Sequence, residues 1–230
     1  MEYQKKDIIL QNPRDRNKIA FVLSNVFSPE ECRALIDRAE LQGFVTALVN
    51  IGNGREKAIL DYRNSDRCII DDPDFSLDIF SRVRRYLPEI FEGRSLVSVN
   101  ERLRILKYTP GNFFRKHCDS SYFRPENGEE SKFTLQIYLN EGSVGGATRF
   151  HSRYEPGVPY TDVIPRTGSV LIFQHDLLHE GALVSAGTKY ALRTDIMYSA
   201  SPSFVAPAPA VVPDFVAQSV FDTDNEIDLR

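Results

Sequence analysis

Apolar residues in the first hundred positions recur at helical spacing. Four of them fall at positions i, i+3, i+4 and i+7 and share one face: Cys32, Leu35, Ile36 and Ala39. Ser28 before Pro29, with Glu31 three residues after the serine, is typical of a helix start with a capping box. Gly43 suits the end of that helix. The pattern therefore predicts a helix between Pro29 and about Gly43.

A second helix is predicted to start at Asp72-Pro73 and to end at Pro88. Its buried face is formed by four residues: Ile79, Val83, Tyr86 and Leu87. Arg82, Arg84 and Arg85 fall between these positions. We therefore expect the three arginines to face solvent rather than to form a binding patch.

From about residue 100 to 200 the chain changes to short apolar runs separated by Gly, Asn and Pro turns. The main runs are 103–106, 133–139, 170–173 and 190–198. Many short strands broken by such turns predict a β-sandwich or barrel. We expect residues 1–100 to form an α/β support region of the same domain and residues 101–200 to form its β core. The Ala/Pro-rich and acidic segment 201–230 is predicted to be an extended or disordered tail.

Composition limits the classes of protein that fit. The chain has 230 residues, 42% of them hydrophobic, and a net charge of −4. This favours one globular domain without nucleic-acid partners. No signal-type segment or membrane-length apolar run is visible. The three cysteines are widely spaced and odd in number, so we expect no disulfide framework and a cytoplasmic or otherwise intracellular location.

The candidate chemistry starts at His117-Cys118-Asp119. Side chains two apart on a strand point the same way, so His117 and Asp119 can face one metal ion. His179, just after the run 170–173, is the candidate third ligand. Two histidines and one carboxylate form the facial triad of non-haem Fe(II) oxygenases, which leaves coordination positions open.

Other interpretations remain open from these residues. A His-x-Asp tripeptide alone is typical of an exposed polar pair. His175 and His179 are four apart and would share a face of a helix, which would suit zinc. However, residues 174–178 follow a strand and resemble a turn, and the pair lacks the glutamate base of zinc hydrolases. We expect His151 at the surface or in a lining position.

Lys189 lies ten residues after His179 at the start of the last strand. Alternation places it on one face with Arg193 and Asp195. A cation inside a barrel requires an anion, and the distal carboxylate of 2-oxoglutarate is one. Tyr108 and Tyr138 lie on strands that should pass the same site. Taken alone, Lys189 also fits an exposed lysine at a strand end.

The motifs together resemble a known family. Residues 103–198 are similar to the 2-oxoglutarate/Fe(II) dioxygenases, specifically their prolyl 4-hydroxylase-like branch. The matching segments are 108–119 (YTPGNFFRKHCD), 136–140 (QIYLN), 145–150 (GGATRF), 165–173 (PRTGSVLIF), and 179–190 (HEG to GTKY). The resemblance implies a mainly β fold with flanking helices, a double-stranded β-helix (jelly-roll or cupin-like) barrel supported by N-terminal α-helices.

The resemblance also implies roles for particular residues. Three match the family's iron ligands: His117, Asp119 and His179. Lys189 matches the residue that binds the far carboxylate of 2-oxoglutarate, with Tyr138 and Tyr108 beside it. Arg193 is the second candidate for that anchor, or a substrate contact. The implied cofactors are Fe(II), 2-oxoglutarate and O2, with ascorbate as a reductant.

The implied activity is hydroxylation of an unactivated C–H bond, with release of succinate and CO2. A prolyl residue of a protein or peptide is the first candidate substrate. The final strand departs from the Trp-rich ending of collagen-type enzymes, so a small-molecule substrate and a non-catalytic binding barrel stay as alternatives. Arg63 and Arg67, in a polar loop, and Tyr122, after the first metal strand, are candidate substrate contacts; solvated loops are the alternative.

Overall fold

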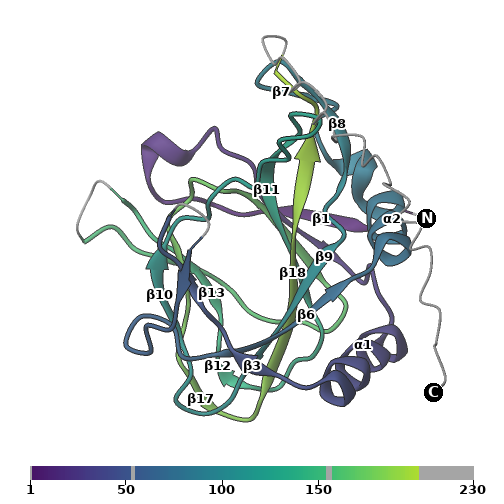
Figure 1. The fold of residues 1–230 in the computed structure, drawn as a ribbon. Helices are drawn as coiled ribbons and strands as arrows, with labels where there is room; N and C mark the ends of the chain where they lie inside the picture. Colours follow the sequence, from purple (N-terminus) through teal and green to yellow (C-terminus); the bar gives the residue numbers. More distant parts are fainter. Residues whose placement is uncertain (1, 53–54, 154–156, 202–230) are drawn as a thin grey trace, which may run out of the picture.

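A computed structural model describes residues 2–52, 55–153 and 157–201. Apart from Ser201, the tail predicted for 201–230 lies outside the described residues. Within them the chain is mainly β, with two α-helices, as predicted. Figure 1 shows two sheets facing each other, with both helices outside the larger sheet.

The larger sheet joins strands from both halves of the chain. Its main path runs β1-β2-β15-β11-β18-β9-β6-β3, and β8 pairs with both β18 and β7. Every pairing is antiparallel. The strands are β1 (Gln4–Asp7), β2 (Ala20–Ser24), β3 (Val45–Thr46), β6 (Asp66–Asp71), β7 (Ile90–Phe91), β8 (Arg94–Val99), β9 (Arg102–Tyr108), β11 (Glu130–Tyr138), β15 (Val170–Gln174) and β18 (Lys189–Tyr198).

The smaller sheet has the order β10-β16-β13-β14. Its strands are β10 (Phe114–His117), β16 (His179–Gly181), β13 (Thr148–Phe150) and β14 (Thr161–Val163). Two separate pairs complete the β structure: β12 (Val144–Gly145) with β17 (Val184–Ala186), and β4 (Val49–Asn50) with β5 (Glu56–Lys57). The described residues also form two 3₁₀ turns, η1 (Pro13–Asp15) and η2 (Arg84–Tyr86).

Strand alternation divides the apolar residues between two cores. On β15, Val170 and Ile172 pack with the helices, whereas Leu171 and Phe173 pack inside the barrel with Phe150 of the smaller sheet. Residues buried on both faces explain why this strand is a continuous apolar run. The strands predicted at 103–106, 133–139, 170–173 and 190–198 are confirmed as the cores of β9, β11, β15 and β18.

The first helix, α1 (Pro29–Gln42), forms as predicted. The Ser28 hydroxyl accepts a hydrogen bond from the Glu31 backbone N–H, and the Glu31 carboxylate accepts one from the Ser28 backbone N–H. Gly43 follows with φ of 93°, a conformation that favours glycine. All four residues of the predicted apolar face are buried. This helix covers the outside of the larger sheet (Figure 1).

The second helix is shorter than predicted. The α-helix α2 (Pro73–Val83) ends five residues before Pro88, and η2 follows it. The prediction that Arg82 faces solvent was wrong. Its guanidinium donates to Glu31 at 2.6 Å and to the Val26 carbonyl at 2.9 Å, which links α2 to α1. Among the described helices, none is long and apolar enough to cross a membrane.

Candidate metal centre

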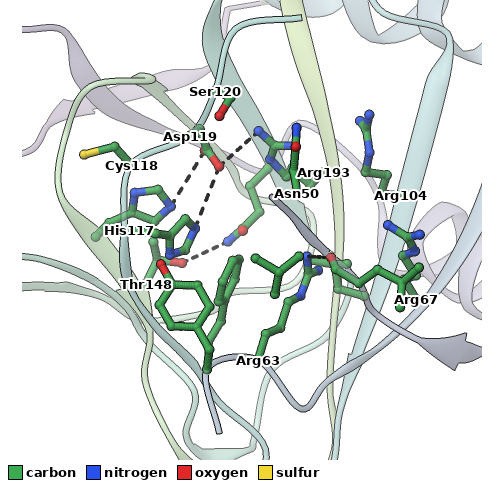
Figure 2. Close-up of a pocket in the computed structure, with 18 of the residues that line it drawn as sticks. Asn50, Arg63, Arg67, Arg104, His117, Cys118, Asp119, Ser120, Thr148 and Arg193 are labelled. Carbon is green, nitrogen blue, oxygen red and sulfur yellow. Dashed lines mark hydrogen bonds and ion pairs between the residues drawn. The ribbon is translucent and has the colours of Figure 1, made fainter. Parts of the chain in front are cut away.

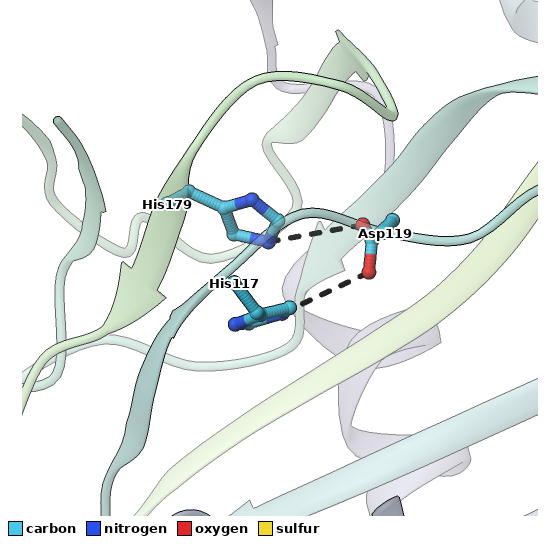
Figure 3. A group of neighbouring side chains, drawn as sticks. All are labelled: His117, Asp119 and His179. Atoms are coloured by element: carbon cyan, nitrogen blue, oxygen red, sulfur yellow. Dashed lines mark ion pairs between the residues drawn. The ribbon is translucent and has the colours of Figure 1, made fainter. Parts of the chain in front are cut away.

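Two neighbouring strands of the smaller sheet bring His117 and His179 together. In the β10–β16 register these histidines are direct partners, so both side chains reach the same side of the sheet. Asp119 completes the group, and one ligand atom from each residue lies within 4.8 Å of the others. Figure 3 shows the carboxylate of Asp119 facing both imidazoles. Among the described residues this is the one group of three or more such side chains that could hold a metal ion.

The reason for the position of Asp119 differs from the one predicted. Strand β10 ends at His117, so strand alternation does not place the aspartate. Instead, the Asp119 backbone N–H donates to the carbonyl of His175, at 2.9 Å, in the turn after β15. The neighbouring Cys118 thiol lies 3.4 Å from the Asp176 carbonyl. Asp119 is therefore held by a contact distant in sequence.

Backbone carbonyls orient both imidazoles. Nδ1 of His117 lies 2.7 Å from the Arg115 carbonyl, and Nδ1 of His179 lies 2.9 Å from the Leu177 carbonyl. A carbonyl accepts a hydrogen bond from Nδ1–H, which leaves the lone pair on Nε2. Nε2 of each histidine is the atom nearer Asp119, at 3.8 Å and 3.7 Å. Both rings thus present an unprotonated nitrogen to the centre of the group.

The protonation states also suit metal binding. Burial, with a smaller contribution from the neighbouring histidine, lowers the pKa of His117 to about 3. Burial likewise lowers the pKa of His179. For Asp119 burial acts in the opposite direction, but the positive charge of Arg193 and the hydrogen bond from Thr134 act against it, and the pKa of the carboxyl lies below its ordinary value. At neutral pH the group therefore consists of two neutral imidazoles and a carboxylate.

Two residues of the larger sheet hold the carboxylate of Asp119. The Thr134 hydroxyl donates to one carboxylate oxygen at 2.5 Å, and the Arg193 guanidinium lies 3.1 Å from the other. Thr134 comes from β11 and Arg193 from β18, which are paired strands. The carboxylate is thus fixed by the sheet opposite the one that carries the histidines.

His175 is not part of the metal group. Its Nε2 lies 2.9 Å from the Ser131 hydroxyl and its Nδ1 lies 3.0 Å from the Thr134 hydroxyl, so both ring nitrogens have partners. Residues 175–177 form a turn, as expected, and not a helix. The alternative in which His175 and His179 share a zinc ion is therefore wrong for this structure. His175 instead orients Thr134 toward Asp119.

Lys189 lies deep in the same barrel. Its side chain is buried, with 3% of the residue exposed, and its Nζ donates to the Gly146 carbonyl at 2.6 Å. Burial lowers the pKa of this amine to about 8. No carboxylate among the described residues lies within ion-pair distance of Nζ. The alternative of an exposed strand-end lysine does not hold, and the predicted buried position is the one observed.

The two tyrosines occupy different positions. Tyr108 lines the cavity, and Nζ of Lys189 lies 5.0 Å from the centre of its ring. Tyr138 is fully buried behind Thr148, to which its hydroxyl donates at 2.8 Å. Thr148, not Tyr138, lines the cavity next to the metal group. Nζ of Lys189 also lies 5.7 Å from the centre of the Tyr138 ring, so a role for Tyr138 beside the cosubstrate stays a prediction.

A cavity of about 280 Å³ connects these residues. Its lining includes both histidines, Lys189 and a group of basic residues: Arg63, Arg67 and Arg104. Figure 2 shows Arg193 beside Asp119, with Arg67 and Arg104 farther from the metal group. Tyr122 also lines the cavity, and 42% of it is exposed.

The site also contains polar residues that were not predicted from the sequence. Thr134 and Gln136 follow each other at two-residue spacing on β11, and Thr148 accepts a hydrogen bond from Gln136 at 2.9 Å. Polar residues at alternate positions of an apolar strand indicate a polar barrel interior, and this pattern is visible in the sequence. Arg104 gives no comparable indication, because many exposed strand positions carry arginine.

Comparisons with known proteins bear on this geometry. Residues 103–194 match the model of the 2OG-Fe(II) oxygenase superfamily, where 2OG is 2-oxoglutarate. All three members of the candidate metal group and Lys189 lie within the matched region. A comparison with curated protein sequences gave no match.

Solved structures of 2OG oxygenases share the fold. A prolyl-4-hydroxylase from Pseudomonas putida is 20% identical, with a TM-score of 0.58 over 79% of this chain and 94% of that one. A Trichoplax adhaerens prolyl hydroxylase, solved with a peptide fragment of hypoxia inducible factor, is 14% identical, with a TM-score of 0.59 over 78% and 83%. A 2OG-Fe(II) oxygenase family protein from Burkholderia pseudomallei is 17% identical, with a TM-score of 0.53 over 78% and 84%. The predicted resemblance and the jelly-roll fold are confirmed.

The residues present fit the metal that the superfamily uses. Two imidazole nitrogens and a carboxylate are the donor set of non-haem Fe(II) oxygenases. The orienting carbonyls and the Thr134 hydroxyl supply the outer contacts that such ligands require. The nearby buried amine of Lys189 is suited to an anionic cosubstrate. The superfamily therefore implies Fe(II), 2-oxoglutarate and O2 at a place where this chain has matching groups.

Proposed function

We propose that the protein is a 2-oxoglutarate/Fe(II)-dependent dioxygenase that hydroxylates an unactivated C–H bond. The observation that carries the proposal is the convergence of His117, Asp119 and His179 within 4.8 Å inside a region that matches the superfamily. We assign these three residues as the iron ligands. Bound Fe(II), with 2-oxoglutarate and O2, supplies the oxidation, which releases succinate and CO2. Ascorbate is the proposed reductant.

Lys189 is the proposed anchor for the far carboxylate of 2-oxoglutarate. A buried ammonium without a carboxylate partner among the described residues is unfavourable until an anion arrives. Arg193, the other candidate, already contacts two carboxylates, those of Asp119 at 3.1 Å and Asp195 at 3.2 Å. We therefore assign Arg193 to the positioning of Asp119 and assign Tyr108 as the lining group beside Lys189.

The first proposed substrate is a prolyl residue of a protein or peptide, with a small molecule as the alternative. Structural neighbours support this order, since two of them are prolyl hydroxylases and one was solved with a peptide fragment. Arg63 and Tyr122 line the cavity and are retained as proposed substrate contacts. Arg67 is bound by Glu56 and is assigned to shaping the cavity.

Succinate formation from 2-oxoglutarate tests the proposal. Purified protein is loaded anaerobically with Fe(II), exposed to air, and assayed with and without proline-containing peptides. The expected result is metal-dependent succinate release that His179→Ala abolishes. Lys189→Ala should require far more 2-oxoglutarate because the buried carboxylate loses its partner.

His151→Ala is the matched control. His151 lies 3.1 Å from Glu180, outside the metal group, so the control should retain activity. Equal activity in His179→Ala and His151→Ala would refute the assignment of the ligands. Metal-dependent binding of 2-oxoglutarate without turnover of any peptide or small molecule would favour the non-catalytic barrel.

A further inference from the structure

We propose that the substrate carries an anionic oxygen group, a carboxylate or a phosphate, and that Arg63 binds it in the cavity beside the metal group. This inference rests on the proposed function and names the substrate class for that site. Arg104 is the second cation of the proposed subsite. Three features of the structure carry the inference: the environment of Arg63, the balance of charge in the cavity, and the distance from Arg63 to the metal ligands.

Arg63 is held in place without a carboxylate partner. Its backbone forms a bridge with Phe114 on β10, and its guanidinium lies over the Phe114 ring, 4.5 Å from the centre. The side-chain nitrogens have long contacts, both of 3.4 Å, with the Ser65 hydroxyl and the Leu48 carbonyl. No carboxylate in the described parts of the chain lies within ion-pair distance. A rigid guanidinium with spare donors is the usual protein partner for carboxylate and phosphate.

Burial and neighbouring positive charges make the charged form of Arg63 unfavourable unless an anion binds. Burial lowers the pKa of Arg63, and the positive charges of Arg193 and Arg67 lower it further. Burial, together with neighbouring arginines, also lowers the pKa of Arg104, against the effect of Asp195. Arg104 lies 3.4 Å from Asp195, a carboxylate that it shares with Arg193. A bound anion would relieve the repulsion among these cations.

The cavity as a whole has an excess of positive charge. Its described lining contains five basic residues: Arg63, Arg67, Arg104, Lys189 and Arg193. It contains three acidic residues: Glu56, Asp119 and Asp195. A divalent metal and the dianion of 2-oxoglutarate cancel each other, so the excess persists in the loaded site. A substrate with negative charge would therefore be drawn into the cavity, and a cationic one repelled.

Arg63 is close enough to the metal ligands for one small group to reach both. The Phe114 ring lies between Arg63 and His117 as a common neighbour. Its centre is 4.5 Å from the Arg63 guanidinium carbon and 3.6 Å from the centre of the His117 ring. The sum of these two distances is the upper limit for the distance between the Arg63 guanidinium carbon and the centre of the His117 ring. It is shorter than three residues of extended chain, at roughly 3.3–3.6 Å per residue. The anionic group and the reacting carbon therefore belong to the same residue or to adjacent ones.

Arg67 provides an internal contrast to Arg63. Both of its terminal nitrogens donate to the carboxylate of Glu56, at 2.9 Å and 2.6 Å. The charge of Arg67 is therefore neutralised by a carboxylate of the protein itself, whereas the charge of Arg63 is not. Removal of the Glu56 charge should free Arg67 and strengthen anion binding. A role for Arg63 in folding alone predicts no such gain.

The test is calorimetric binding of matched probes to anaerobic protein that is loaded with Mn(II) and 2-oxoglutarate. Two sets of probe pairs differ in charge at nearly the same shape: N-acetyl-L-proline against its amide, and other N-acetyl amino acids against their amides. A third pair, glycerol 1-phosphate against glycerol, adds a phosphate group. Wild type is expected to bind anionic members in preference to neutral ones. The carboxylate and phosphate arms identify which anion is favoured.

Arg63→Gln should weaken binding of the favoured anion on the order of tenfold to a hundredfold, the effect of one charge-assisted hydrogen-bonded pair. Arg104→Gln should weaken it less, and Glu56→Gln should strengthen it. Arg102→Gln is the matched control, because Arg102 lies on β9 with Arg104 but outside the cavity lining, and its guanidinium donates to Asp71 at 2.9 Å and 3.0 Å. This control should leave anion binding unchanged.

Three outcomes would overturn the inference: acids and amides that bind wild type equally, anions that bind no tighter than chloride, or an anion preference that survives in Arg63→Gln. The binding of 2-oxoglutarate is measured first on every sample. Loss of metal-dependent 2-oxoglutarate binding in wild type would reject the proposed function itself. Normal 2-oxoglutarate binding without anion preference would reject this inference alone.

Discussion

Replacement of Lys189 by methionine should change stability and cosubstrate affinity in opposite directions. Burial lowers the pKa of this amine from 10.5 to about 8. At about 1.4 kcal/mol per pH unit, the buried charge destabilises the metal-free and cosubstrate-free protein by about 3 kcal/mol at pH 7. Methionine has a similar length and no charge. Replacement of Lys189 by methionine leaves the Gly146 carbonyl without a hydrogen-bond donor, which offsets about 1 kcal/mol of the stability gained by removal of the buried charge.

We therefore expect Lys189→Met to increase the free energy of unfolding by about 2 kcal/mol at pH 7. The folded-state pKa lies below the unfolded one, so the penalty in wild type is complete below about pH 8. It disappears as the pH rises toward 10.5, where the amine is neutral in both states. The difference in stability between variant and wild type should shrink over that interval.

Urea unfolding at several pH values measures the stability, and calorimetry with Mn(II) measures 2-oxoglutarate affinity. The variant should bind 2-oxoglutarate at least about a hundredfold more weakly, because a buried carboxylate without its partner costs roughly 3–5 kcal/mol. Lys6→Met, on the exposed strand β1, is the control and should alter neither property. A variant that is less stable than wild type, or that binds 2-oxoglutarate equally well, would refute the reasoning.

Three further predictions follow from single contacts. Thr134→Val removes the hydroxyl that donates to Asp119 and should weaken metal affinity on the order of tenfold to a hundredfold in a metal titration, while unchanged affinity would argue against the contact. Ser28→Ala removes a helix cap and should lower the free energy of unfolding by about 1 kcal/mol without affecting metal affinity. Gly168→Ala should destabilise the fold strongly in urea, because φ is 73° and the new methyl group would overlap the Phe27 carbonyl; an unchanged midpoint would contradict this.

Local features of the fold were the most predictable from sequence. The capping box of α1 depends on residues three apart, and strand alternation in β11 and β18 depends on residues two apart. Such patterns are determined by nearby residues and persist in the folded chain. The end of α2 was not predictable in this way, since η2 replaces its last turn before Pro88.

Contacts distant in sequence were the least predictable. Asp119 lies near the histidines because its backbone bonds to the turn at His175, not because of strand alternation. The sharing of Asp195 between Arg104 and Arg193 depends on the β9–β18 register, which joins distant segments. The hydrogen bond from the Tyr138 hydroxyl to Thr148 was likewise not visible in the sequence. These features depend on the packing of one sheet against another, which periodicity does not encode.

The central claim is that three side chains hold a metal which in turn holds 2-oxoglutarate. Calorimetric titration of 2-oxoglutarate into metal-free and Mn(II)-loaded protein tests this most directly. The account predicts binding in the loaded protein, little in the metal-free protein, and loss of the metal-dependent part in His117→Ala. Binding of 2-oxoglutarate that is equally tight without metal, or unaffected by His117→Ala, would contradict it.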